Sequence, residues 1–437
     1  MAACAAGEEG VVGLRFKGEG PSGEPVEAHP PLLLRVAGQS RWGPFAYQPV
    51  LARQGRRITR EHQLPLALMG HLLEAYQVGP VPELLVLGGG GRRLERERIR
   101  LTSGLRKQLS EALRKLNADL ERPQPPALAA DRRKCTLCSW RESCSRVASA
   151  DGHLSEVSGI GAKRREMLQE LGVHGLNDLA SANPERLVVE MERFGEQHGD
   201  VARGLVAQAV AQRDGLVERL DSTFALPELQ GAPGVLLYDI ESDPDARHDF
   251  LHGFLRLPRQ SDGRWDLAAA TYHPLLVMAE HGEQRSWLRL QRLLSRYDGW
   301  PILHYGETET LSLRRLAQRQ GASDAQLRRL KRRLVDVHAR IRSHWRLPLS
   351  SYGLKSVAAW RGFRWSQAGV DGARALLWWR QWLGEGPKRR GSRHGLAWIF
   401  RYNQDDCRAT WAVAEWLLKE DDLLKTGPDT DQPTAGP

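Results

Sequence analysis

The sequence predicts an α/β protein that contains more than one domain. Its 437 residues exceed what one small fold needs, because a domain takes about 150 residues. Between residues 235 and 424, apolar runs typical of buried strands alternate with segments of helical periodicity, which is the pattern of an α/β domain. Between 153 and about 220 the periodicity is helical throughout, which indicates a small all-α module.

The charge balance is basic. Lys and Arg total 63 against 53 for Asp and Glu, a formal net charge of +10, which excludes an acidic protein. No run approaches the roughly 20 apolar residues that cross a bilayer, and Met1 to Cys4 lacks the basic and apolar regions of a signal peptide. We therefore expect a soluble cytoplasmic protein that does not bind a membrane.

Composition divides the chain into four regions. The first is rich in Gly, Pro and Arg, with an amphipathic helix predicted over 62–77 and a break at 123–126 before a group of cysteines. The predicted boundaries are 1–150 for this region, 151–225 for the all-α module, 230–424 for the α/β domain and 425–437 for a disordered tail.

The elements of the α/β domain follow from apolar runs and helical spacing. The run at 235–238 is typical of a buried strand, since four apolar residues follow the hinge Gly231-Ala232-Pro233-Gly234. Apolar or alternating residues predict the other strands and 3.6-residue spacing predicts the helices. The further strands are predicted at 249–255, 267–272 and 300–305, and the helices at 286–297, 309–318, 372–382 and 396–418.

Two carboxylates end the first of these strands. Asp239 and Glu241 are two residues apart, so on a strand they project from the same face. Like charges this close are unfavourable unless a cation neutralises them, and hard oxygen ligands suit Mg²⁺ or Mn²⁺. The alternative is that the strand simply ends in solvent, so the metal hypothesis depends on further acidic partners.

Two other segments offer those partners. Tyr402 and Asp406 are one helical turn apart and can share a pocket, unless the segment is an ordinary amphipathic helix with a solvated acid. A strand ending at Tyr305 leads into a helix whose first turn holds Glu307 and Glu309. Either glutamate can be the ligand, or both can simply stabilise the helix dipole.

Taken in this order, the carboxylates resemble those of the DEDD family of 3′–5′ exonucleases, in its Tyr-containing branch, which has a ribonuclease-H-like fold. Residues 235–418 look most like the YprB-type domain of RecB-like putative nucleases. The resemblance implies that Asp239, Glu241, Glu309 and Asp406 bind two Mg²⁺ or Mn²⁺ ions and that Tyr402 orients the attacking water. One departure is Glu309, where the wider family has Asp.

The same resemblance assigns two more residues. Asp336, within Leu334-Val335-Asp336-Val337, is similar to a position that supports the site, and Lys355 is similar to one that contacts phosphate. The run 328–333, with five basic residues, precedes Asp336 and is either a solvated helix face or a guide for a nucleic-acid strand.

Three cysteines have the spacing of a metal or cluster site. Cys135, Cys138 and Cys144 can wrap one centre, and either an iron–sulfur cluster or zinc needs a fourth ligand. The segment resembles the cluster-binding part of RecB-type and CRISPR-associated nucleases, whose [4Fe-4S] cluster takes one further Cys from upstream. Cys4 is the upstream candidate here.

Residues 31–90 resemble the later half of that RecB-type nuclease domain. The family pattern places an acidic residue and a Lys on adjacent strand positions, but the strand 47–53 has Gln48 and no Lys. We therefore expect a degenerate domain that is structural or holds DNA. Because the match begins midway through the family's domain, it leaves open a start before Met1 and a fourth Cys upstream of it.

The all-α module fits a helix-hairpin-helix. Gly159 and Gly161 would let backbone N–H groups approach a phosphate at a helix start, with Lys163 and Arg164 beside it, unless the glycines form only a tight turn. Such a module binds nucleic-acid backbone without reading sequence.

The function expected from these residues is hydrolysis of phosphodiester bonds by a divalent-metal-dependent nuclease, a 3′–5′ exonuclease acting on DNA. The alternatives are a non-catalytic nucleic-acid-binding scaffold and an RNA-directed exonuclease. The four carboxylates present in order favour catalysis, because metal chemistry requires them and a scaffold does not.

Overall fold

The computed structural model describes residues 1–54, 60–81, 83–89, 94–125, 127–128, 135, 138, 140–244, 246, 248–278, 282–385 and 392–426. Its internal contacts divide the chain into two units, Met1–Ala127 and Leu128–Pro437. The division precedes the predicted boundary at 150, because helix α4 (Arg141–Ala150) contacts the turn Leu154–Glu156 of the all-α module. The cysteine group therefore belongs to the second unit, and the predicted tail from 427 onward lies outside the described residues.

The first unit is built on a five-stranded sheet that helix α2 (Arg60–Gln77) covers. The helix predicted at 62–77 is confirmed, and its Leu66, Leu72 and Leu73 are buried with Tyr47 of the sheet. The sheet order is β1 (Gly10–Val11), β4 (Leu32–Ser40), β5 (Gly43–Gln54), β6 (Leu84–Gly89) and β7 (Leu94–Ile99). The remaining elements are α1 (Ala2–Ala5), the hairpin β2 (Phe16–Glu19) and β3 (Pro25–Ala28), and α3 (Ser103–Leu120).

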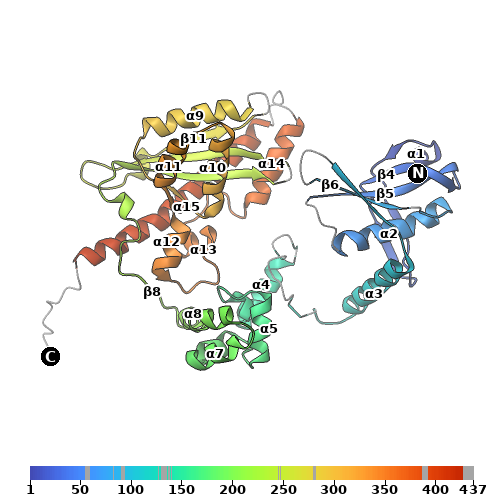
Figure 1. The fold of residues 1–437 in the computed structure, drawn as a ribbon, viewed down its shortest axis with the longest axis horizontal. Helices are drawn as coiled ribbons and strands as arrows, with labels where there is room; N and C mark the ends of the chain where they lie inside the picture. Colours follow the sequence, from blue (N-terminus) through green and yellow to red (C-terminus); the bar gives the residue numbers. More distant parts are fainter. Residues whose placement is uncertain are drawn as a thin grey trace. The chain divides into compact units, whose positions relative to one another are not determined.

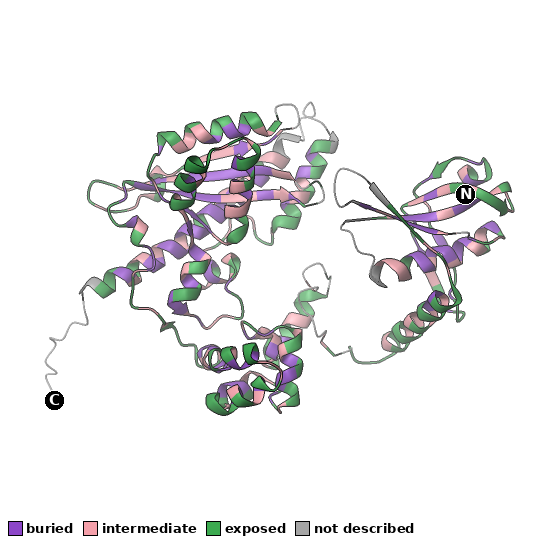
Figure 2. Ribbon diagram, viewed as in Figure 1, coloured by how far each residue is buried: buried purple, intermediate pink, exposed green. Residues whose placement is uncertain are grey.

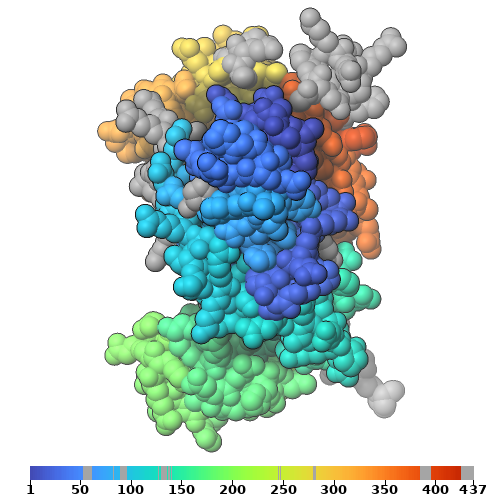
Figure 3. All heavy atoms as spheres, turned by 90° about the vertical axis from the view of Figure 1, so that its right-hand side faces the viewer, coloured from blue at the N-terminus to red at the C-terminus, as the bar shows by residue number. Residues whose placement is uncertain are grey.

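The module that follows α4 is helical, as predicted, and its body is green in Figure 3. Leu154, Val157, Ile160 and Leu168 bury their side chains in its core. Gly159 has φ +93°, a value that L side chains rarely adopt, and it turns the chain from the Leu154–Glu156 turn toward the next helix. The helices are α5 (Ala162–Glu170), α6 (Leu176–Ser181), α7 (Pro184–Glu192) and α8 (Glu196–Asp214).

The C-terminal domain has a mixed five-stranded sheet, one strand more than the four that the sequence predicts. Its order is β11 (Thr271–Leu276), β10 (His248–Pro258), β9 (Gly234–Asp243), β12 (Ile302–His304) and β13 (Leu334–Asp336). Strand β9 pairs antiparallel with β10 and parallel with β12. The strand predicted at 267–272 is wrong in its first half, because the Asp266 side chain accepts a hydrogen bond from Ala268 N and caps a 3-10 turn at Leu267–Ala269.

Helices cover both faces of this sheet, and its central strands are buried (Figures 1 and 2). Alternate residues of β9 face opposite sides, so Leu236 and Tyr238 enter one core while Val235 and Leu237 enter the other. The first face carries α9 (Gly282–Arg296), α10 (Glu307–Arg319) and α11 (Asp324–Arg333). The second carries α12 (Val337–His344), α13 (Leu354–Trp360) and α15 (Ser392–Thr426), and α14 (Gly372–Glu385) packs on α15. Among the described helices, none is long and apolar enough to cross a membrane.

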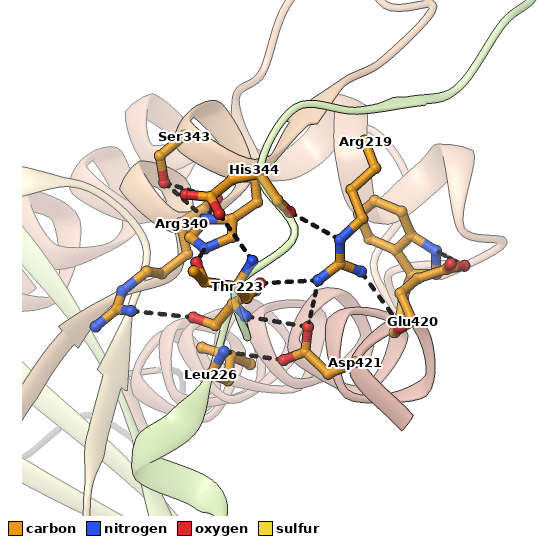
Figure 4. A network of polar contacts seen from close by, with 11 residues as sticks. Arg219, Thr223, Leu226, Arg340, Ser343, His344, Glu420 and Asp421 are labelled. Atoms are coloured by element: carbon orange, nitrogen blue, oxygen red, sulfur yellow. Dashed lines mark hydrogen bonds and ion pairs between the residues drawn. The ribbon is translucent and has the colours of Figure 1, made fainter. Parts of the chain in front are cut away.

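The segment between the all-α module and the sheet is fastened to the end of α15 (Figure 4). The Asp421 carboxylate accepts hydrogen bonds from the backbone N–H groups of Ala225 (3.0 Å) and Leu226 (3.1 Å) and from Arg219 (3.0 Å). Just before it, β8 (Glu218–Arg219) pairs with β14 (Trp345–Arg346). These bonds fix where the chain enters the domain.

Replacement of Asp421 by Ala is expected to destabilise the protein by roughly 2–4 kcal/mol, because it leaves two buried N–H groups without an acceptor and removes the ion pair with Arg219. Asp421 is 3% exposed, so water cannot replace the carboxylate freely. Denaturant unfolding measures the change. The control is Glu415→Ala, which removes an exposed ion pair with Lys419 and should cost less than about 0.5 kcal/mol. Equal losses in the two variants would contradict the role of Asp421.

Candidate metal centre

Three carboxylates converge on the face of the sheet that α15 covers. Asp239 and Glu241 lie on β9, on the side opposite Tyr238, and Asp406 projects from α15 toward them. One oxygen from each of the three lies within 4.8 Å of the others. In the described part of the chain, no other group of three acidic, His or Cys side chains lies close enough together to hold one metal ion. Such a group can bind a divalent cation.

Glu309 lies beside this group, and Glu307 does not. Glu309 is the third residue of α10 and is 8% exposed, whereas Glu307 is exposed to solvent. The charge of Glu309 contributes to the raised pKa of Asp239, but Glu309 is not among the three carboxylates whose oxygens lie within 4.8 Å of one another. Burial therefore distinguishes the two glutamates that the sequence left equivalent.

The site is strained electrostatically in the absence of a cation. Burial, and next the neighbouring charges, raise the pKa values of Asp239 and Glu241 well above the ordinary carboxylate range. Burial also raises the pKa of Asp406 to about 6 and that of Glu309 to about 7. Glu241 Oε1 and Glu309 Oε2 are buried and accept no hydrogen bond from the described residues. Unpaired buried carboxylate oxygens fit Mg²⁺ or Mn²⁺, which prefer oxygen ligands.

Two neutral donors hold the carboxylates in place. Asn403 Nδ2 donates to Asp239 Oδ2 at 2.6 Å, and Trp365 Nε1 donates to Asp406 Oδ1 at 2.6 Å. The hydroxyl of Tyr272 in turn donates to Asn403 Oδ1 at 2.7 Å, so the amide cannot rotate freely. None of these three residues was predicted from the sequence. Asn403 lies between Tyr402 and Asp406, and this position was its single available signal.

Tyr402 and Lys355 complete the polar surroundings of the site. Tyr402 is buried one helical turn before Asp406, and burial raises the pKa of its phenol above the usual value, so the hydroxyl stays protonated. Lys355 Nζ lies 5.3 Å from the centroid of the Tyr402 ring and donates to Val370 O at 2.6 Å. Its charge lowers the pKa values of Glu241 and Asp406 against the effect of burial.

Asp336 acts on the site through the backbone. It ends β13 and caps α12, where its Oδ1 accepts hydrogen bonds from His338 N at 2.9 Å and Ala339 N at 3.2 Å. The same oxygen accepts from Gly306 N at 2.9 Å. Since Gly306 is the N-cap of α10, this bond positions the turn that carries Glu309.

Comparison with known proteins agrees with this geometry. Residues 236–418 match the RNase H superfamily. The matched segment contains the whole carboxylate group, and the C-terminal domain is thus ribonuclease-H-like. Members of the RNase H superfamily act on nucleic acids, are typically metal-dependent nucleases and usually use Mg²⁺ or Mn²⁺. Among curated proteins, none matches this sequence.

The cysteine group is not assembled into a ligand set. Within the described residues, Cys135, Cys138 and Cys144 do not bring their sulfur atoms within 4.8 Å of one another. Cys138 N donates to Cys135 O at 3.0 Å, a tight turn, while Cys144 lies on α4. Cys4, the predicted fourth ligand, is fully buried in the apolar core of the first unit. Its use as a ligand would require that segment to leave the core.

The strand that resembles the RecB-type motif lies in a basic cleft. Gln48 of β5 lines it together with Arg35, Arg96 and Arg98, and Glu9 is the single carboxylate among the described lining residues. This combination suits an anion better than a divalent cation, because guanidinium groups compete with a metal for the carboxylate. The first unit therefore lacks, in its described part, the acidic group that the C-terminal domain has.

The predicted hairpin residues lie at the turn before α5. Gly159 and Gly161 flank Ile160, and Lys163 is exposed in the first turn of the helix. Arg164 is half-buried and donates to Gly159 O at 2.7 Å, so it braces the turn as well as carrying charge.

Two residues of the basic run 328–333 stabilise the packing of helices. Arg333 donates to three backbone carbonyls, those of Leu294, Tyr297 and Trp300. Arg329 forms a hydrogen-bonded ion pair with Asp298 at 2.5 Å. These two side chains therefore fasten α11 to the end of α9, and a guiding role falls to the exposed remainder of the run, Arg328, Lys331 and Arg332.

Gly253→Ala is expected to disrupt the metal centre by displacing Asn403. A Cβ at this position of β10 would lie 1.6 Å from Asn403 Oδ1, a distance that no contact permits. Asn403 would have to leave Asp239, and the overpacking should cost about 1–3 kcal/mol or more in the free energy of unfolding. Thermal unfolding measures the change, with Gly372→Ala as the control because its Cβ meets nothing within 4 Å. A stable Gly253→Ala variant would contradict the packing described.

The metal-free protein is expected to lose stability as pH rises from 5 to 8. Carboxyls with raised folded-state pKa values, about 6 for Asp406 and about 7 for Glu309, bind more protons folded than unfolded in this window. Asp239→Asn should therefore be more stable than the natural protein at pH 8, by about 1–2 kcal/mol, and the difference should shrink toward pH 5. Added Mn²⁺ should raise the melting temperature of the natural protein and not that of the variant.

Melting curves across this pH range, in EDTA and in Mn²⁺, measure both effects. The quantity that decides is the difference in stability between Asp239→Asn and the natural protein in EDTA. If this difference is the same at pH 8 as at pH 5, these carboxylates do not repel one another. A Mn²⁺ effect of equal size in both proteins would place the ion elsewhere.

Proposed function

We propose that this protein is a divalent-metal-dependent nuclease, a 3′–5′ exonuclease that hydrolyses phosphodiester bonds of DNA at the carboxylates of its C-terminal domain. The observation that supports it most is the convergence of Asp239, Glu241 and Asp406 within 4.8 Å, where the buried Glu241 Oε1 has no partner among the described residues. A scaffold gains nothing from this arrangement, because repulsion between buried carboxylates destabilises the fold unless a cation is bound.

The residues around the carboxylates divide the chemical work. Mg²⁺ or Mn²⁺ held by Asp239, Glu241 and Asp406 would supply Lewis-acid activation of the phosphodiester and of water. Tyr402, protonated and hydrogen-bonded to Asp406, orients the attacking water. Glu309, buried beside these three carboxylates, would be a further metal ligand, as the resemblance to the DEDD family implies. Lys355 offers its ammonium to a phosphate oxygen.

The direction of attack and the preference for DNA rest on the resemblance to the Tyr-containing DEDD exonucleases. The product of this direction is a nucleoside 5′-monophosphate. The all-α module and the basic first unit contribute backbone contacts in this proposal, and the cysteine group remains a predicted site for an iron–sulfur cluster or zinc.

Asp239→Ala is expected to lower the rate of nucleotide release by about a hundredfold or more, because loss of a metal ligand removes several kcal/mol of transition-state stabilisation. Glu309→Gln and Tyr402→Phe should reduce it by smaller factors, about tenfold to a hundredfold. Single- and double-stranded DNA and RNA, labelled at the 5′ end, are incubated with Mg²⁺ or Mn²⁺. A ladder of shortening labelled strands indicates removal from the 3′ end.

Glu307→Gln is the matched control, since Glu307 lies in the same helical turn as Glu309 and is exposed. It should leave the rate unchanged within about twofold. Release of no nucleotide from any of the four polymers would favour the scaffold, and release from RNA alone would favour the RNA-directed enzyme. Equal activity of the natural protein and Asp239→Ala would move catalysis to another site.

A further inference from the structure

A second cleft lies within the Leu128–Pro437 unit, where the hairpin of the all-α module meets the ribonuclease-H-like domain. Its volume is about 330 Å³. Gly159 and Arg164 line it from the hairpin, and Arg342, Trp345, Arg346 and Tyr352 line it from the other domain. None of these residues belongs to the metal centre.

Buried hydrogen bonds hold the two walls of this cleft together. Gln208 of α8 donates to Leu347 O at 2.9 Å, and its Oε1 accepts from the Tyr352 hydroxyl at 3.0 Å. The Tyr352 hydroxyl in turn accepts from Leu347 N at 2.7 Å. Leu220 N donates to His344 O at 2.7 Å, next to the network of Figure 4. The all-α module, which carries the turn at Gly159, therefore has a defined position against the ribonuclease-H-like domain.

The lining of the cleft offers hydrogen-bond donors and positive charge. Three guanidinium groups, Arg164, Arg342 and Arg346, line it, and no carboxylate is among the described lining residues. Arg346 pairs with Glu218, whereas Arg342 is exposed and forms no ion pair with the residues that the structure describes.

Two further donors in the lining lack a partner. The Nε atom of Arg164 and the Nε1 atom of Trp345 are buried, and no described residue accepts a hydrogen bond from either. Trp345 itself is 6% exposed. Leaving a buried donor unpaired costs about 1–3 kcal/mol. The three guanidinium groups of the lining favour a ligand that carries several acceptor oxygens and negative charge. A phosphate group has both properties.

The cleft lies close to the metal centre along the chain. Tyr352 lines it, and Lys355, three residues later, lies over the ring of Tyr402. Three residues span at most about 10 Å. The hydroxyl of Tyr305, next to the turn that carries Glu309, also hydrogen-bonds to Tyr352 O at 2.5 Å. Tyr352 thus connects the cleft with the turn that carries Glu309 and with the helix that carries Lys355.

We propose that this cleft binds a backbone phosphate of the nucleic-acid strand whose end is at the metal centre, with Arg164 and Arg342 as its contacts. The inference rests on the proposed nuclease function and names where that site holds its substrate. The proposal places the junction between the all-α module and the ribonuclease-H-like domain on the path of the substrate. A substrate with a single phosphate would not contact the cleft.

Arg342→Ala tests the proposal, because Arg342 is exposed and its loss should not affect folding. A fluorescent 15-nucleotide single strand of DNA is titrated in EDTA, and anisotropy gives its affinity at several salt concentrations. The variant should bind about fivefold to tenfold more weakly, and its salt dependence should be smaller by roughly the 0.7 expected for one phosphate contact of a single strand. Arg285→Ala, an exposed arginine on α9 at the opposite face of the sheet, should bind as the natural protein does.

Hydrolysis of the p-nitrophenyl ester of thymidine 5′-monophosphate separates this proposal from the nuclease function. The ester has a single phosphate, which the metal centre would hold, so none remains for the cleft and Arg342→Ala should hydrolyse it at the natural rate. Unchanged oligonucleotide affinity and salt dependence in Arg342→Ala would overturn the cleft even where the ester is hydrolysed. If the natural protein hydrolyses neither ester nor oligonucleotide, the nuclease proposal fails, while the affinity measurement still decides whether the cleft holds a strand. An equal loss of affinity in Arg342→Ala and Arg285→Ala would also overturn it, since that result indicates diffuse charge.

Discussion

The repulsion among three converging carboxylates, of which Glu241 and Asp406 are buried, is the constraint on which the C-terminal domain depends. Asp239 and Glu241 must share a face because they alternate with Tyr238 on one strand, and α15 brings Asp406 onto the same face. Apolar burial on both sides of the sheet offsets the repulsion, since fully buried Tyr238 and Cys407 directly adjoin Asp239 and Asp406. The fold therefore holds an arrangement that is unfavourable until a cation binds, and the raised pKa values express that cost.

The neighbours of the carboxylates orient them without neutralising them. Asn403 and Trp365 are neutral donors, and each occupies one oxygen of its partner. Gly253 provides the space for Asn403, because any Cβ there would collide with the amide. A cationic donor at either place would satisfy the charge and remove the need for a metal. The choice of an amide and an indole thus preserves affinity for a divalent cation.

The sequence predicted those parts of the site that lie on regular patterns. The apolar run before Asp239 and the helical spacing of Tyr402 and Asp406 are local signals, and the strands and helices they predict are present. Glu307 and Glu309 differed only after folding, when one was buried. Gly253, Tyr272 and Trp365 act on α15 across long stretches of chain, so no local pattern marks them. The 3-10 turn at Leu267–Ala269 was mistaken for a strand because its cap is a side-chain hydrogen bond.

The positive charges follow a similar logic, since their position in space matters more than their grouping in the sequence. In the conspicuous basic run 328–333, Arg333 donates to backbone carbonyls, whereas Arg164 and Arg342, which are 178 residues apart in the sequence, line one cleft. Lys355 shows why it is useful for a basic residue to lie apart from the carboxylates. Its ammonium donates to Val370 O and lies over the ring of Tyr402, near enough to lower the pKa values of Glu241 and Asp406. Because it forms no ion pair with either carboxylate in the described structure, Glu241 Oε1 stays available to a metal. A basic residue can thus favour an anionic substrate beside an acidic centre without occupying the oxygens that the centre requires.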